Sequence, residues 1–385
     1  MQRKIIEILN GRLAEKYPLI QVVLGPRQVG KTTAAQATYD AFPGAKFIAS
    51  ADSPTPLSSD WLEARWLQAR AAPKPTLLIL DEIQKVFGWS EVVKKLFDED
   101  RNKIDLRVLL LGSASLTLQS GIKESLAGRF ELIPVEHWNF AECSEAFGWD
   151  LELFLKYGGY PGAARYITDK VRWQSYLKNS IIEPVLGRDI SAAISIAKPA
   201  LFRQVFEIAM HYPAQELSYQ KIVGQLQERG SVQTVKHYLE ILEGAFLLRQ
   251  IFRYSSRPLT TRTSSPKIVI PAPALIHAFA DPGRVDLDPD WRGRVFESVI
   301  GATLCSATNK VFTWREKSEE VDYIIESNPD LFAVEVKSGR RVQSSGLDAF
   351  IRNFPHAKPI VVTPNNCAAL LSGGDLIKTL IEWKD

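Results

Sequence analysis

This chain of 385 residues contains few side chains suited to disulfide bonding or transition-metal binding. Its three cysteines, Cys143, Cys305 and Cys367, form no C-x-x-C pair, and its five histidines are not spaced like metal ligands. This scarcity excludes a disulfide scaffold and a zinc cluster, and it favours a reducing compartment.

Long apolar segments are missing as well. No apolar run approaches the roughly 20 residues that span a bilayer. The first residues, Met1 to Leu13, carry charges inside their apolar pattern and have no signal-peptide core. We therefore expect a cytoplasmic protein without a membrane partner. The net charge of only +3 means that any nucleic-acid binding must come from a local basic patch.

The length and composition indicate a globular protein of several domains. Apolar residues form 45% of the chain and charged residues 24%, which is ordinary globular composition, and 385 residues exceed one hydrophobic core. In the first segment, short apolar runs alternate with helical stretches, which predicts a parallel sheet wrapped by helices. The five predicted strands are Leu19–Leu24, Lys46–Ala49, Thr76–Leu80, Leu106–Leu111 and Glu131–Val135.

A phosphate-binding loop follows the first of these strands. Residues 25–32 satisfy G-x-x-x-x-G-K-[ST] in full, between a strand and a helix. Glycines let backbone N–H groups face phosphate oxygens, Lys31 should reach the β- and γ-phosphates, and the Thr32 hydroxyl should bind Mg²⁺. ATP is therefore the predicted ligand. The predicted nucleotide-binding residues are Gly25, Pro26, Arg27, Gln28, Val29, Gly30, Lys31, Thr32 and Thr33.

Two acidic residues end the third predicted strand. Asp81 stands where a carboxylate can hold magnesium, and Glu82, one residue later, can orient and deprotonate the attacking water. Together with the phosphate-binding loop, this pair predicts ATP hydrolysis.

Two further positions each have a functional and a structural interpretation. Ser113, after the fourth strand, could sense the γ-phosphate or could only cap a helix. Arg129, just before the fifth strand, could act as an arginine finger on a neighbouring subunit's nucleotide or could form a surface ion pair. The first interpretation of Arg129 predicts an ATP-dependent homo-oligomer.

The middle of the chain carries a candidate DNA-binding segment from Glu216 to Lys267. Apolar spacing predicts two helices joined by a turn at Gly230, which leaves Gln233, Thr234, Lys236 and His237 to face a groove. No acidic residue occurs from Gly244 to Ala280, so the basic loop after the helices should meet phosphates. The alternative is a helical hairpin that only packs against the ATPase. The loop's basic residues are Arg249, Arg253, Arg257, Arg262 and Lys267.

The last segment holds four polar residues whose order is typical of a metal site. Glu297 lies on an amphipathic helix, Asp322 and Glu335 lie on the two arms of a predicted hairpin, and Lys337 follows on the face of Glu335. Such oxygen ligands suit Mg²⁺ or Mn²⁺, and the lysine could polarise a metal-bound water. The alternatives are a solvated strand face, or an inactive site kept only for DNA binding.

With these motifs, the chain resembles the AAA+ type ATPases of bacteria and archaea that carry a C-terminal domain of unknown function. The resemblance rests on the motifs above together with Tyr157-Gly158-Gly159-Tyr160-Pro161 and Val235-x-x-Tyr238-Leu239. It implies sensor-1 and arginine-finger roles for Ser113 and Arg129. It also implies an α/β fold: a P-loop AAA+ parallel sheet with a helical lid, a winged helix, and an α/β nuclease-like domain of the PD-(D/E)xK kind. The implied boundaries are 1–140, 141–205, 206–280 and 281–385.

One stretch departs from the pattern of that family. The family has a strand of the form K-x-Y-F-x-D-x-G-L after its wing, whereas this chain has Lys267-Ile268-Val269-Ile270-Pro271-Ala272-Pro273-Ala274-Leu275. Alanines therefore replace the acidic and glycine positions.

Three functions fit these observations. The preferred one is an ATP-driven protein that acts on DNA and carries a nuclease-like module. The second is a nucleotide-dependent switch whose C-terminal domain only binds a partner or DNA. The third is a DNA-binding ATPase with an inactive nuclease fold. Cleavage of DNA with Mg²⁺ separates the first from the others, and slow turnover with tight nucleotide retention favours the second.

Overall fold

A computed structural model describes residues 3–16, 18–113, 126–228, 230–255, 265–280, 289–339 and 345–383. The chain forms two compact units. The first comprises Met1–Glu136 together with Pro184–Ser195, and the second comprises His137–Glu183 together with Ile196–Asp385. The segment Pro184–Ser195 therefore belongs with the N-terminal unit, and the lid and domain boundaries that the resemblance implies stay predictions.

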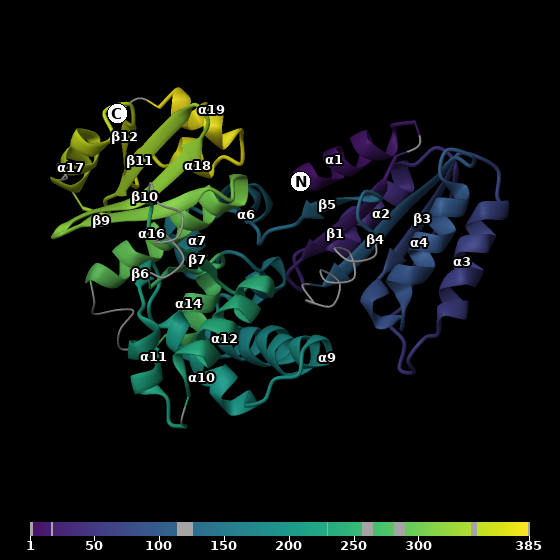
Figure 1. The fold of residues 1–385 in the computed structure, drawn as a ribbon, viewed down its shortest axis with the longest axis horizontal. Coiled ribbons are helices and arrows are strands. Elements are labelled where there is room, and N and C mark those ends of the chain that lie inside the picture. Colours follow the sequence, from purple (N-terminus) through teal and green to yellow (C-terminus); the bar gives the residue numbers. More distant parts are fainter. Residues whose placement is uncertain are drawn as a thin grey trace. The chain divides into compact units, whose positions relative to one another are not determined.

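The first unit is built on a parallel sheet of five strands in the order β2-β3-β4-β1-β5 (Figure 1). All five strands that the apolar runs predicted are confirmed, with shifts of one or two residues at their ends. The strands are β1 (Ile20–Gly25), β2 (Ala45–Ser50), β3 (Thr76–Asp81), β4 (Leu106–Ser113) and β5 (Phe130–Pro134).

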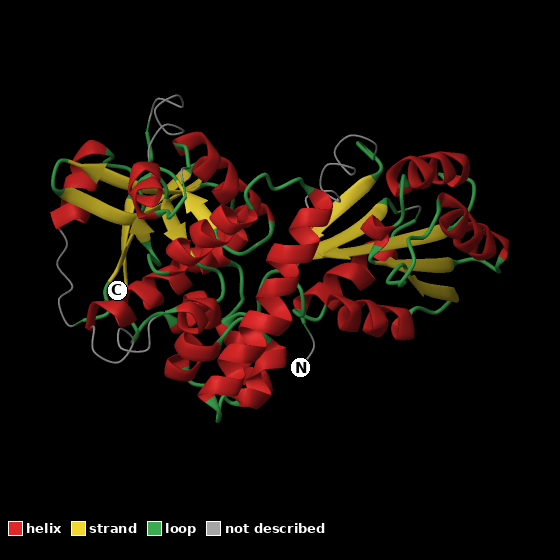
Figure 2. Ribbon diagram, turned by 90° about the horizontal axis from the view of Figure 1, so that it is seen from below, coloured by secondary structure: helices red, strands yellow, loops and turns green. Residues whose placement is uncertain are grey.

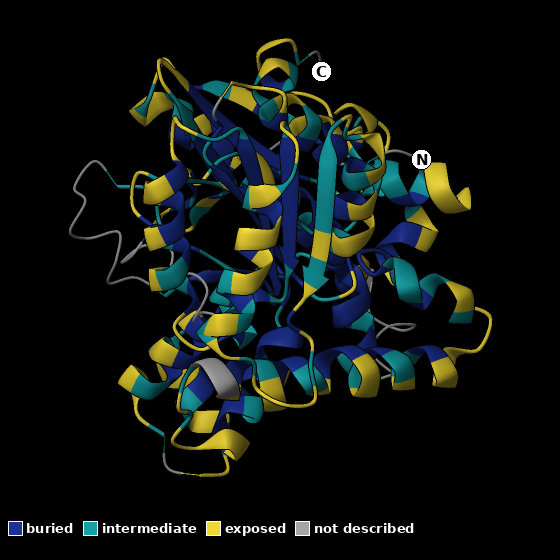
Figure 3. Cartoon of the chain, turned by 90° about the vertical axis from the view of Figure 1, so that its right-hand side faces the viewer, coloured by how far each residue is buried: buried dark blue, intermediate teal, exposed yellow. Residues whose placement is uncertain are grey.

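Helices cover both faces of this sheet (Figure 2). The inner strands β1 and β4 are buried along their whole lengths, which explains why their sequences are mostly apolar apart from Gln21, Arg107 and the terminal Ser113 (Figure 3). Trp66 and Val93 pack in the core beneath one layer of helices. The helices of the unit are α1 (Lys4–Leu13), α2 (Lys31–Ala41), α3 (Ser59–Ala71), the 3₁₀ turn η1 (Ile83–Lys85), α4 (Trp89–Asp100), the π-helical η4 (Val185–Asp189) and α9 (Ile190–Ala193).

Because the strands are parallel, their carboxyl ends meet at one edge of the sheet. Gly25 at the end of β1 lies opposite Ser113 at the end of β4. Asp81 ends β3, which pairs with β4 on its other side. Three motifs that are far apart in the sequence therefore come together at this edge.

The second unit begins with helices that pack through aromatic rings. The rings of Trp138, Phe147, Trp149, Tyr157 and Trp173 form a chain of ring contacts. The helices are α6 (Phe140–Phe147), α7 (Leu151–Tyr157), η2 (Pro161–Tyr166), α8 (Lys170–Ser175) and η3 (Tyr176–Ile182).

The Gly-Gly-Tyr-Pro motif after α7 packs against the stretch that departs from the family pattern. Gly159 has a φ of 108°, and a Cβ there would overlap the side chain of Ala272. Ala272 and Ala274 are fully buried, and the Ala274 N–H donates to the carbonyl oxygen of Gly158 at 3.1 Å. The small alanines therefore fill a close backbone contact where an unpaired carboxylate would be costly.

A three-stranded antiparallel sheet with the order β6-β8-β7 follows. Three helices precede or join its strands, and two of them form the predicted pair of helices, since Ile222, Val235 and Leu239 are buried. The elements are α10 (Pro199–Met210), β6 (Gln215–Glu216), α11 (Tyr219–Gln225), α12 (Val232–Gly244), β7 (Arg249–Ile251), β8 (Lys267–Val269) and α14 (Pro273–Phe279).

The C-terminal part of this unit is a four-stranded sheet with the order β12-β11-β10-β9. Strands β9, β10 and β11 are antiparallel neighbours, and β12 is parallel to β11. The predicted helix that carries Glu297 and the predicted hairpin that carries Asp322 and Glu335 are confirmed. The elements are α16 (Pro289–Ala307), β9 (Val311–Glu316), β10 (Glu319–Ser327), β11 (Asp330–Val336), α17 (Ser345–Asn353), β12 (Lys358–Val362), α18 (Ala368–Leu371) and α19 (Leu376–Ile381).

Within the described residues, no helix has both the length and the apolar character needed to cross a membrane.

Candidate nucleotide site

The phosphate-binding loop joins β1 to α2 by a tight path that depends on glycine. A Cβ on Gly25 would overlap the carbonyl oxygen of Val135, so only glycine fits there. Gln28 and Gly30 have positive φ values of 58° and 89°. Gly30 is the residue before the first turn of α2, so the loop ends at a helix N-terminus, which favours an anionic ligand.

Lys31 folds back over this loop. Its Nζ donates to the carbonyl oxygens of Gly25 at 3.0 Å and Pro26 at 2.5 Å. Burial lowers the pKa of Lys31 to about 8, although the nearby carboxylates of Glu82 and Asp81 oppose that shift. The buried ammonium group is thus held over the phosphate-binding loop, where a bound anion would stabilise its charged form.

Thr32 and Asp81 meet at the carboxyl edge of the sheet. The Thr32 hydroxyl donates to Asp81 Oδ2 at 2.9 Å. A hydroxyl and a carboxylate beside a phosphate-binding loop are oxygen donors of the kind that Mg²⁺ takes. These two residues therefore fit a magnesium ion, directly or through its water shell.

Glu82 is held by a residue that the sequence analysis missed. Glu82 has a φ of 54°, and its N–H donates to Asp81 Oδ1 at 2.9 Å. The Gln84 amide donates to Glu82 Oε2 at 2.6 Å and to the Ser113 hydroxyl at 3.1 Å. Gln84 thereby links the predicted base to the predicted sensor. Its position two residues after Glu82 is the one signal that the sequence offers for it.

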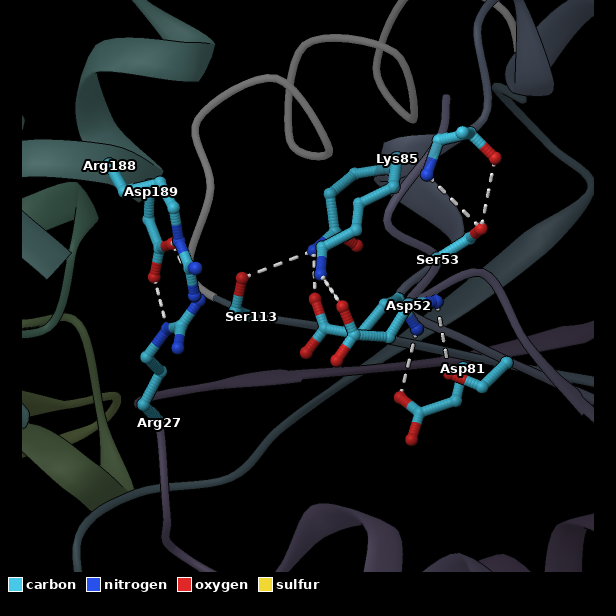
Figure 4. Close-up of polar contacts among 12 residues, drawn as sticks. Arg27, Asp52, Ser53, Asp81, Lys85, Ser113, Arg188 and Asp189 are labelled. Carbon is cyan, nitrogen blue, oxygen red and sulfur yellow. Dashed lines mark hydrogen bonds and ion pairs between the residues drawn. The ribbon is translucent and has the colours of Figure 1, made fainter. Parts of the chain in front are cut away.

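Asp189 also reaches the phosphate-binding loop, and nothing in the local sequence pointed to it. Arg27 and Asp189 form a bidentate ion pair, in which Arg27 Nη2 donates to Asp189 Oδ1 at 2.6 Å (Figure 4). The neighbouring Arg188 lies 3.8 Å from the same carboxylate. A segment more than 150 residues along the chain therefore anchors the loop.

Arg129 lies at the opposite edge of the sheet. Its carbonyl oxygen accepts from the N–H of Ile20 at the start of β1, whereas the nucleotide motifs follow the ends of the strands. Its guanidinium group makes two hydrogen bonds to Asp98, at 2.7 and 2.8 Å. Arg129 is thus not positioned to reach the phosphate-binding loop of its own chain, and its finger role stays a prediction.

In the second unit, Glu297 and Asp322 come together around a lysine. Lys267 Nζ forms an ion pair with Glu297 Oε1 and lies 3.4 Å from Asp322 Oδ1. Burial raises the pKa of Glu297 to about 8, while Lys267 opposes the shift. Burial by itself lowers the pKa of Lys267, but the two carboxylates raise it above its ordinary value.

Glu335 and Lys337 share a face of the sheet, as the alternation predicted. Lys337 Nζ donates to Glu335 Oε1 at 2.5 Å, and Asp322 Oδ2 accepts from the N–H of Val336 at 2.8 Å. We call Glu297, Asp322 and Glu335 the carboxylate cluster. Over the described part of the chain, no group of three acidic, histidine or cysteine residues has a geometry that could hold a metal ion. The metal-binding role of the cluster stays a prediction.

The predicted basic loop is less exposed than its sequence suggested, and part of its positive charge is paired with an acidic residue. Lys267 is only 7% exposed, so the prediction that it contacts DNA is wrong. Arg253 pairs with Glu216 through contacts of 2.8 and 3.1 Å, because β6 brings an acidic residue from outside the loop. Arg257 and Arg262 lie outside the described residues.

The comparisons with known proteins agree with the geometry of the first unit. Residues 18–144 match the family model of an AAA domain, and residues 148–284 and 292–380 match two domains of unknown function, DUF8612 and DUF4143. An uncharacterized protein of Mycobacterium tuberculosis is 28% identical over 337 residues, which are 85% of this chain and 71% of the relative. An uncharacterized protein of Haemophilus influenzae is 22% identical over 318 residues, 79% of this chain and 76% of the relative.

A solved structure has a similar fold. The Walker-type ATPase of Pyrococcus abyssi matches 72% of this chain and 95% of its own, with a TM-score of 0.50 and 14% identity. At that identity the likeness concerns the fold. Together with the match of residues 18–144 to the AAA domain and the phosphate-binding loop, it shows that the N-terminal unit has the α/β fold of P-loop ATPases.

Proposed function

We propose that this protein is a magnesium-dependent ATPase that uses ATP hydrolysis to act on DNA. The observation that carries the proposal is the convergence at one sheet edge of the Lys31 ammonium, the Thr32–Asp81 contact and the Glu82–Gln84–Ser113 chain of hydrogen bonds. Each part has a defined task in phosphoryl transfer.

In the proposed reaction, the Glu82 carboxylate accepts a proton from water as the water oxygen attacks the γ-phosphorus. The bond to the β–γ bridging oxygen breaks, which leaves ADP and inorganic phosphate. Lys31 and the loop N–H groups stabilise the negative charge of the phosphates. Magnesium held by Thr32 and Asp81 would supply further charge neutralisation. Ser113, placed by Gln84, would contact the γ-phosphate.

Two substitutions test this assignment. Lys31→Ala should abolish tight ATP binding, because the phosphates lose a buried counter-ion. Glu82→Gln should keep ATP binding and lose turnover, because the amide cannot accept the proton. Nucleotide binding and phosphate release are measured separately. Hydrolysis by Glu82→Gln at the wild-type rate would show that another group acts as the base.

We also propose that Arg129 acts in trans, in an ATP-dependent homo-oligomer. Its place at the sheet edge away from the phosphate-binding loop supports action on a neighbouring subunit, and its release from Asp98 would be part of assembly. Arg129→Ala protein mixed with Lys31→Ala protein should recover hydrolysis at hybrid interfaces. Absence of rescue at every mixing ratio, with mixed oligomers demonstrated, refutes action in trans.

DNA association is assigned to a winged helix within residues 206–280. The order α10-β6-α11-α12-β7-β8, with β8 between β6 and β7 in the sheet, is the order expected of a winged helix and supports this part of the proposal, although α10 begins at Pro199, before residue 206. Gln233 and His237 on α12 are exposed, and Lys236 is partly exposed beside them. The alternative, a helical hairpin that only packs against the rest of the unit, predicts no DNA binding by α12.

Lys236→Ala should weaken DNA binding and reduce the slope of its salt dependence by about one. Lys378→Ala, which removes an exposed lysine from α19, is the matched control. DNA affinity is measured as a function of salt concentration. Equal losses for both variants would indicate a diffuse charge effect and not a recognition helix.

For residues 281–385 we propose a nuclease-like fold. Helix α16, the meander β9-β10-β11, helix α17 and the parallel β12 bring the carboxylate cluster and Lys337 together, which supports the assignment. If the module cuts DNA with Mg²⁺ or Mn²⁺, Asp322→Ala and Lys337→Ala should abolish cleavage and leave the ATPase intact. The position of Lys267 favours the third of the functions that fit the sequence, a DNA-binding ATPase with an inactive nuclease fold.

A further inference from the structure

A buried lysine fills the centre of the carboxylate cluster. Lys267 Nζ contacts Glu297 Oε1 and Asp322 Oδ1, and it also lies 3.3 Å from the carbonyl oxygen of Asp322. The ring of Tyr323 lies under the same ammonium group, with its centroid 4.6 Å away. These partners are three oxygens and an aromatic face, which is a set of contacts suited to a cation.

The lysine has little freedom to leave this place. Its backbone lies in β8, the central strand of the three-stranded sheet, and pairs with Glu216 on one side and Ile251 on the other. Its side chain is 9% exposed, so its aliphatic stem is enclosed as well. Lys267 therefore belongs to a different sheet, and its side chain extends into the α16–β12 fold while its backbone is fixed in β8.

The strand that carries Asp322 is shaped for this contact. The pairing of β10 with β9 shifts register between Val321 and Ile324, which marks a bulge or irregularity at Asp322 and Tyr323. Such irregularities redirect side chains locally. As a result, the carboxylate of Asp322 and the ring of Tyr323, neighbours in sequence, both contact one ammonium group.

Two further oxygens of the cluster are also engaged. Asp322 Oδ2 accepts from the Val336 N–H at 2.8 Å, and Glu335 Oε1 accepts from Lys337 at 2.5 Å. A divalent ion needs several oxygen ligands and room between them. Here the room between Glu297 and Asp322 holds an ammonium group, and a metal ion placed there would leave that buried charge without its partners. The residues present do not fit a divalent metal.

We infer that Lys267 takes the place of the divalent metal ion in this module. The inference rests on the proposed nuclease-like fold of residues 281–385. The Lys267 ammonium group supplies the positive charge beside Glu297 and Asp322, so the module holds its shape without metal and does not activate water by a metal ion. The same contact ties β8, and with it the end of the proposed wing, to the carboxylate cluster.

The test is a Mn²⁺ titration of the full chain, followed by the electron paramagnetic resonance signal of the free ion. All variants carry Asp81→Asn and no nucleotide is added, so that the ATP site contributes no metal. The parent and its Glu297→Gln variant should bind the same amount of Mn²⁺, because the parent holds no Mn²⁺ at the carboxylate cluster. Lys267→Ala should gain one Mn²⁺ per chain, and Lys267→Ala combined with Glu297→Gln should lose it again. Lys267→Arg, which keeps a cation, should gain none.

Two outcomes overturn the inference. One is a Mn²⁺ ion bound to the parent and lost on Glu297→Gln, since the site would then accept metal despite the lysine. The other is a folded Lys267→Ala protein that gains no Mn²⁺, since the position of the lysine would then not be a metal position. If Lys267→Ala does not fold by circular dichroism, the comparison of the parent with Glu297→Gln still decides the first outcome. ATP hydrolysis and DNA binding are measured separately on the chain that keeps Asp81, so a failure of the proposed function is distinguishable.

Discussion

Gln84 offers the sharpest test of how the ATP site is organised. Its amide joins Glu82 Oε2 at 2.6 Å to the Ser113 hydroxyl at 3.1 Å. Gln84→Ala removes both bonds and frees the Glu82 carboxylate to rotate. A hydrogen bond to a charged acceptor contributes about 1.5–3 kcal/mol. If that contribution is realised in the transition state, kcat should fall about 10- to 150-fold.

The pattern of the kinetic constants matters as much as the size of the loss. Gln84 makes no hydrogen bond to the phosphate-binding loop among the contacts described, so the KM for ATP should stay unchanged while kcat and kcat/KM fall together. Phosphate release is measured across a range of ATP concentrations. Gln84→Met, which keeps the side-chain length without a donor, should behave like Gln84→Ala and so separates hydrogen bonding from packing.

A matched control exists on α2. Gln36 donates from its amide to Asp40 at 2.9 Å on the exposed face of the helix, so Gln36→Ala removes a similar bond away from the site. It should leave kcat unchanged. A wild-type kcat for Gln84→Ala, or a rise in KM with unchanged kcat, would refute the view that Gln84 orients the base.

Three further predictions concern the phosphate-binding loop. Gly25→Ala should destabilise the first unit by about 1–3 kcal/mol in urea unfolding, because the new methyl group overlaps the carbonyl oxygen of Val135; an unchanged midpoint would contradict this. The charged form of Lys31 binds phosphate, and the pKa of Lys31 is lowered to about 8. ATP binding should therefore take up a proton above pH 8 but not well below it. Above pH 8 the affinity for ATP should fall up to about tenfold per pH unit. Calorimetry in buffers of different ionisation enthalpy measures this uptake, and its absence at about pH 9 would contradict the pKa. Asp189→Asn should leave Arg27 without its carboxylate partner and destabilise the first unit by about 1–3 kcal/mol in the same assay, whereas an unaltered unfolding curve would mean that the ion pair is not needed.

The sequence by itself determined the architecture of the ATPase core. Strands buried on both faces of a parallel sheet are mostly apolar, so β1, β3 and β4 are visible as apolar runs despite single polar residues such as Gln21 and Arg107. The phosphate-binding loop is equally visible, since its glycines, Lys31 and Thr32 follow one another within eight residues. Alternation along β11 placed Glu335 and Lys337 on one face for the same local reason. Each of these features depends on neighbours in the chain.

Only the tertiary structure decided which distant groups complete the sites. Asp189 reaches Arg27 from a segment that returns to the first unit, Gln84 reaches across to Ser113, and Lys267 enters the carboxylate cluster from another sheet. Lys267 looked like a DNA-contacting residue because its nearest acidic partners lie 30 and 55 residues along the chain. Charge pairing acts through space over a few ångströms, and the sequence records neighbours along the chain, so such partners become visible only when the chain has folded.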